Sequence, residues 1–132
     1  MPGDLDPLTA LRRLVSLIFD YLDAHRDFVR LIAIENLHRA VHLKHSPAIR
    51  SVNADVITIL ESILARGRAQ GRFARDCGAV EVHLMISRLC FHRVSNRHTS
   101  GAIFGCDLSA AEVKQRHKAM IVDMIVRYLP AE

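Results

Sequence analysis

Apolar residues recur three and four positions apart along almost the whole chain of 132 residues. This spacing is that of helices with one buried face, and no internal repeat or low-complexity tract interrupts it. We therefore predict an all-α fold, a single helical bundle of about five main helices formed by one domain over residues 1–132. The predicted helices cover residues 6–25, 27–43, 46–71, 78–94 and 109–129.

Capping residues mark where most of these helices begin. Asp6-Pro7 and Ser46-Pro47 each place a short polar side chain before a proline that fits a first helical turn. Asp27 is expected to cap the second helix, because one helix from Asp6 to Leu43 would be unusually long. Ser109 and Glu112 have the spacing of a capping box before the last helix.

Glycines mark where the chain leaves a helix. Gly71 is expected to end the third helix in the left-handed conformation, with Phe73 packing back onto it. The segment 95–105, which reads SNRHTSGAIFG, is predicted to be a loop or a short helical turn.

Composition narrows the class of protein. Tryptophan is absent and aromatic residues make up 5% of the chain, so the core must consist mainly of aliphatic side chains. The formal charge of +4 comes from scattered Lys and Arg, and a basic total without a basic face is weak evidence for nucleic-acid binding. The three cysteines lack a C-x-x-C spacing, which favours a reducing, cytoplasmic setting. The sequence also has no apolar run long enough to span a membrane and no signal-peptide pattern at its start, so we predict a protein with no membrane segment.

The last predicted helix has an unusually wide apolar surface. Glu112, Arg116, Asp123 and Arg127 share one narrow stripe, and apolar side chains cover the rest of the circumference. A single contact with the core does not need so wide an arc. Part of this helix is therefore expected to contact a second protein chain.

The stretch LIAIENLHRAVHLKH, residues 31–45, has the most candidate chemistry. Glu35, His38 and His42 are spaced so that one helix face could hold zinc or iron, which makes a helical metalloprotein or enzyme one alternative. A di-iron site would need a second Glu-x-x-His unit, and Glu61, Glu81 and Glu112 are not followed by one. No hydrolase, P-loop or dinucleotide-binding motif is present.

The same stretch also fits a ligand pocket. On a helical wheel the face that carries Phe28, Leu31 and Ile32 later carries Glu35 and His38. A face that changes from apolar to polar suits a cleft with a polar mouth, and it equally suits the docking of another helix. A scaffold domain whose cavity is closed by its own side chains is a further alternative.

Four stretches resemble the C-terminal ligand-binding and dimerisation domain of TetR-family transcriptional regulators, in the YcdC-like branch. They are DFVRLIAIENLH, SPAIRSVNADVITILESILARGRAQGRF, CFHRVSNRHTSGAIFG and HKAMIVDMIVRYL, in family order over most of the chain. The resemblance implies a non-enzymatic domain that binds a small-molecule effector, needs no cofactor or metal, and forms a homodimer through its last two helices. A complete regulator of this family begins with a helix-turn-helix domain, which this chain lacks, so DNA binding would require that domain upstream.

With this resemblance, two sets of residues become candidate sites. The expected effector-binding residues are Phe19, Leu31, Glu35, His38, Met85 and Leu89, with Asn96 and His98 as further polar candidates. The expected dimer-interface residues are Met85, Ile86, His117, Met120, Ile121, Met124 and Tyr128.

Overall fold

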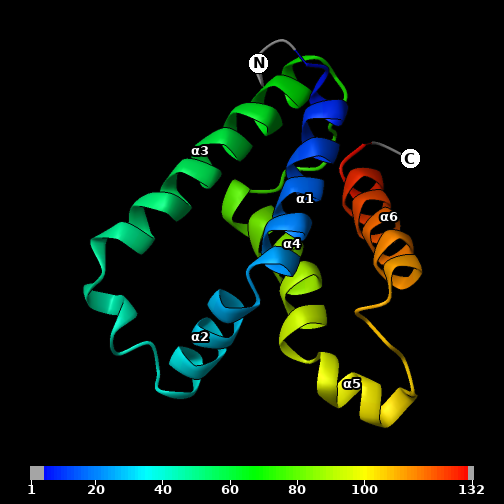
Figure 1. Ribbon diagram of the computed structural model, residues 1–132. Helices are drawn as coiled ribbons and strands as arrows, with labels where there is room; N and C mark the ends of the chain where they lie inside the picture. The colour runs from blue at the N-terminus through cyan, green and yellow to red at the C-terminus, as the bar shows by residue number, and fades with distance from the viewer. Residues whose placement is uncertain (1–4, 131–132) are drawn as a thin grey trace.

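The computed structural model describes residues 5–130, except for the side chain of Val52. Within this range the chain is all-α, with six α-helices and one short 3-10 helix (Figure 1). The elements are α1 Pro7–Ala24, α2 Arg26–Leu37, η2 Leu43–His45, α3 Pro47–Ala69, α4 Ala79–Ser95, α5 Arg97–Phe104 and α6 Ala111–Tyr128. None of these helices is both long and apolar enough to cross a membrane.

The first helix organises the packing of the others. α1 contacts α2, α3, α4 and α6, and α4 contacts α2, α3, α5 and α6 in turn. The core is aliphatic as expected, with single buried phenylalanines on α1 and after α3. Its side chains with no more than 2% exposure include Leu11, Val15, Phe19, Val29, Leu60, Ile63, Leu64, Ile86, Cys90 and Leu129. Burial raises the pKa of Cys90 to about 12, so this thiol is an inert part of the core.

Several predicted boundaries are confirmed. The Asp6 carboxylate accepts a hydrogen bond from the Thr9 amide at 3.3 Å and caps α1. α3 is followed by Gly71 with φ +68°, and the buried Phe73 packs against the helix where Gly67 has no side chain. The left-handed glycine and the returning phenylalanine are the helix end that the sequence predicts.

Some predicted boundaries differ from the structure. Asp27 lies in the first turn of α2, whose N-cap residue is His25. The N-cap of α6 is Ala110, and Ser109 donates its amide to Asp107 instead of forming a capping box. Residues 97–104 form the complete helix α5, which the left-handed Gly105 ends, so the bundle has six α-helices in its described part.

The largest difference concerns the second helix, which ends at Leu37 and not near Leu43. Arg39 and Ala40 adopt φ values of +59° and +58°, a conformation that non-glycine residues rarely take. The chain then turns through η2 into α3. A sequence without glycine or proline between 31 and 45 gives no sign of this break.

Candidate functional site

A buried carboxylate holds the turn between α2 and α3. Glu35 is 7% exposed, and its Oε2 accepts hydrogen bonds from the amides of His42 at 3.2 Å and Leu43 at 3.3 Å. Its Oε1 lies 2.6 Å from Nδ1 of His42. Burial alone would raise the pKa of Glu35, but the hydrogen bond from His42 and those from the two amides outweigh it and lower that pKa. Glu35 is therefore an ionised cap for η2.

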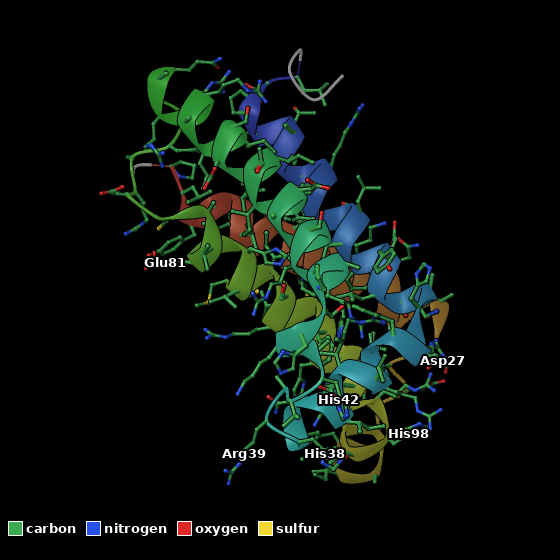
Figure 2. All side chains as sticks on the ribbon, turned by 90° about the vertical axis from the view of Figure 1, so that its left-hand side faces the viewer. Asp27, His38, Arg39, His42, Glu81 and His98 are labelled. Carbon is green, nitrogen blue, oxygen red and sulfur yellow. The ribbon has the colours of Figure 1, made fainter. Side chains whose placement is uncertain are left out.

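The other two residues of the proposed metal set do not form a metal site with this carboxylate, although His42 is hydrogen-bonded to it. The His42 side chain is 81% exposed, and His38 is an exposed residue at the end of α2. Figure 2 shows Arg39 at the same corner, pointing away from the protein. No group of three or more His, Cys, Asp or Glu side chains within residues 5–130 is arranged to hold a metal ion. The single helical face assumed for Glu35, His38 and His42 is wrong, because the helix ends at Leu37.

The remaining residues predicted to bind effector are spread over the bundle. Phe19 is 2% exposed, and the Arg93 guanidinium lies 4.3 Å from the centre of its ring. Leu31 and Met85 are about half exposed, at 54% and 46%. Of the other three residues predicted to bind effector, Leu89 is half-buried, and Asn96 and His98 are exposed. His98 lines a hollow of about 390 Å³ beside α5, together with Arg97, Gly101, Cys106, Asp107, Leu108 and Ser109.

Apolar surface is left uncovered where α2 and α3 separate. None of the described side chains in residues 47–59 of α3 is buried, although the second half of the same helix is part of the core. α2 has few contacts with α3, and Leu31, Ile34 and Leu37 on α2 are at least half exposed. The described residues thus leave apolar surface free on both helices, which run apart from their shared corner at η2 (Figure 1).

A second exposed apolar surface lies on α4 and α6. Met85 on α4 is 46% exposed, and Met120, Met124 and Tyr128 on α6 are 53–55% exposed. Ile86 and Ile121, which we also assigned to the dimer interface, are 0% and 7% exposed and pack into the core. His117 is half-buried. We use the name dimer face for Met85, Met120, Met124 and Tyr128.

Comparison with known proteins identifies the family. The family model described as "Tetracyclin repressor-like, C-terminal domain" matches residues 7–125, which is nearly the whole chain. The chain belongs to this TetR C-terminal domain family. It is also 36% identical over 124 residues to the HTH-type transcriptional repressor NicS of Pseudomonas putida, covering 94% of the chain and 58% of that repressor. Both matches are to repressors of transcription or to domains of such repressors.

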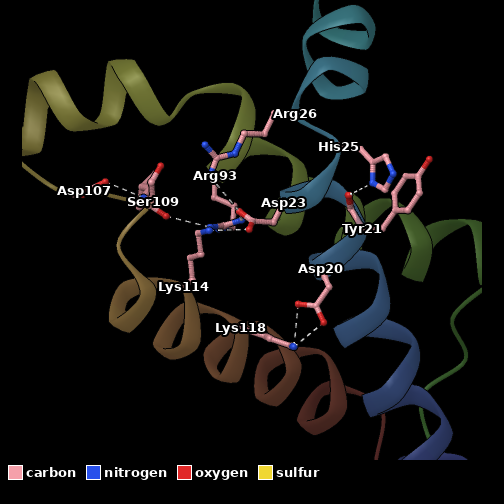
Figure 3. A network of polar contacts seen from close by, with 11 residues as sticks. Asp20, Tyr21, Asp23, His25, Arg26, Arg93, Asp107, Ser109, Lys114 and Lys118 are labelled. Atoms are coloured by element: carbon pink, nitrogen blue, oxygen red, sulfur yellow. Dashed lines mark hydrogen bonds and ion pairs between the residues drawn. The ribbon is translucent and has the colours of Figure 1, made fainter.

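Sequence reasoning did not predict the polar centre of this TetR-type domain. Asp23, at the end of α1, lies 3.1 Å from Nη1 of Arg93 on α4 and 2.9 Å from Nζ of Lys114 on α6 (Figure 3). Arg26, the first residue of α2, lies 4.0 Å from the same carboxylate. Burial would raise the pKa of Asp23, but hydrogen bonds from Lys114 and Arg93 outweigh it and lower that pKa.

This centre joins helices α1, α2, α4 and α6. Arg93 is 6% exposed and also donates to the Leu108 carbonyl at 3.1 Å, just before α6. One turn earlier on α1, Asp20 binds Lys118 of α6 at 2.8 Å. The sequence contains one sign of this polar centre. Arg93 is a charged residue within the otherwise apolar stripe of residues 86, 90 and 94, and a charged side chain at a buried position needs a partner.

Proposed function

We propose that this chain is the effector-binding and dimerisation domain of a TetR-like transcriptional regulator that works in the cytoplasm. The observation that carries the proposal is the family match over residues 7–125. A small molecule would bind between helices α1 to α4 and favour one of two arrangements of the dimer. The chain spans 58% of the length of the repressor it matches, so we assign DNA binding to a helix-turn-helix domain of a longer protein.

The dimer face supports the dimerisation half of this proposal. Three methionines and a tyrosine are about half exposed on two neighbouring helices, and residues of these types are enriched at protein interfaces. Complete burial of one such side chain stabilises an assembly by about 1.5–3 kcal/mol. A second copy would bury this face against its own α4 and α6, giving a four-helix contact with twofold symmetry.

We expect Met124→Glu to convert a dimer into a monomer. A carboxylate at the centre of an apolar interface must be desolvated without a partner, which should weaken association at least about a hundredfold. Light scattering at micromolar concentration measures this, with two chains expected for the unmodified protein and one for the variant. Leu17→Glu is the matched control, because Leu17 is 65% exposed on α1 and its change should leave the mass at two chains.

A monodisperse monomer for the unmodified chain would contradict dimerisation through this face.

The effector-binding half of the proposal is tested separately by thermal-shift screening of small molecules. A ligand at a hundred times its dissociation constant adds about 2.7 kcal/mol to the free energy of unfolding. If no compound raises the melting temperature, the scaffold alternative gains support over the sensor.

A further inference from the structure

The two halves of the buried stripe of α4 face different neighbours. At 100° per residue the order around this helix is Met85, Leu89, Arg93, Ile86, Cys90, His83, Val94 and Ser87. Arg93 faces α6, because it binds the carbonyl of Leu108 and shares Asp23 with Lys114. His83 lies in the other half of the stripe, between the buried Cys90 and Val94, and Ser87 lies at its edge. Figure 1 shows α3 and α2 on the side of α4 away from α6.

His83 carries an unsatisfied buried nitrogen on the half of the stripe that faces away from α6. Its Nδ1 is buried and has no hydrogen-bond partner among the described residues, and its Nε2 lies 3.4 Å from the Ser87 hydroxyl. Burial lowers the pKa of His83, so the ring is neutral at pH 7 and carries one proton. When Ser87 donates to Nε2, that proton sits on Nδ1, which becomes a buried donor without an acceptor. A buried donor without an acceptor lowers the stability of the folded chain by about 1–3 kcal/mol, and such donors are rare in proteins.

We propose that His83, held by Ser87, donates Nδ1–H to an acceptor oxygen of the effector, and that the effector is a small organic carboxylate. This inference rests on the proposed effector-binding function. The uncovered apolar side chains of α2 and the first half of α3 would cover the apolar body of such a ligand. A carboxylate fits better than a neutral carbonyl, because it can form a charge-assisted hydrogen bond with the imidazole and because the chain has a net charge of +4.

The test uses benzoate, benzamide and benzyl alcohol as probes on the intact chain at millimolar concentration. Imidazole ¹⁵N NMR reports the tautomer and hydrogen bonding of His83, and a thermal shift reports binding. We expect benzoate to move the His83 ring signals and raise the melting temperature, and benzyl alcohol to do neither. His83→Gln should weaken benzoate binding at least about tenfold. His92→Gln, an exposed residue of the same helix on the side away from His83, should leave binding unchanged.

Each other result has a definite meaning. Benzoate that stabilises the chain without moving the His83 signals, or equal binding by His83→Gln, overturns the inference and leaves effector binding intact. A response to benzamide alone overturns the carboxylate assignment. If benzoate has no effect, the inference fails, and the wider thermal-shift screen decides separately whether effector sensing fails with it. Should His83→Gln not fold, Ser87→Ala takes its place, because it removes the group that sets the tautomer and should also weaken benzoate binding.

Discussion

Replacing Asp23 by alanine should lower the free energy of unfolding by about 2–4 kcal/mol. The variant leaves Arg93 buried at 6% exposure with its Nη1 unpaired, while its Nε already lacks a hydrogen-bond partner within the described chain. Lys114 and Arg26 lose the same carboxylate. Removing one partner of a buried ion pair costs more than the pair contributes, because the remaining charge stays desolvated. Urea denaturation at pH 7 and fixed protein concentration measures the change.

Two further variants test that explanation. Asp27→Ala is the control, because the Asp27 side chain is fully exposed and lies 3.9 Å from Arg30, so its loss should change stability by less than about 0.5 kcal/mol. Adding Arg93→Met to Asp23→Ala removes the stranded charge and should restore most of the lost stability. Equal stability of Asp23→Ala and Asp27→Ala would show that the centre is not a stabilising ion network.

The contribution of Asp23 should also depend on pH. Its pKa is lower in the folded chain than the value of 3.8 for an unperturbed aspartate. The unfolded chain therefore binds a proton first as the pH falls, and stability is lost between pH 3.8 and the folded pKa. Above that window the difference between the unmodified chain and Asp23→Ala should be constant, and within it the difference should shrink as the pH falls.

Gly67→Ala should be the second strongly destabilising substitution, by about 2–3 kcal/mol. A methyl group at position 67 would lie 2.0 Å from a ring carbon of Phe73, which is 3% exposed. The ring would have to leave its place, and this cost exceeds the gain of about 1 kcal/mol from alanine in a helix. Thermal and urea denaturation measure the effect.

A double-mutant cycle separates the clash from other effects. In a Phe73→Ala background the methyl group meets open space, so Gly67→Ala should become neutral or slightly stabilising. Gly78→Ala is the control, because a methyl group there has no neighbour within 4 Å, and its cost should stay below about 1 kcal/mol. A strong loss in the Phe73→Ala background would contradict the clash.

Much of the architecture follows from local pattern. The spacing of apolar residues defines helices α1, α3, α4 and α6, and Asp6 and Gly71 mark a start and an end correctly. Capping and periodicity act over a few neighbouring residues, so the sequence contains them directly. The family resemblance follows from the same chain and is confirmed, whereas its YcdC-like branch stays a prediction.

The sequence by itself determined an all-helical regulator domain with a surplus of apolar surface on its last helix. The tertiary structure decided which apolar residues are surplus, because a rotation of 100° per residue separates the buried Ile86 from the exposed Met85. It also decided where α2 ends, since Glu35 caps amides seven and eight residues later in the chain. Asp23 and Arg93 are 70 residues apart, and only the packing of α1 against α4 brings their charges together.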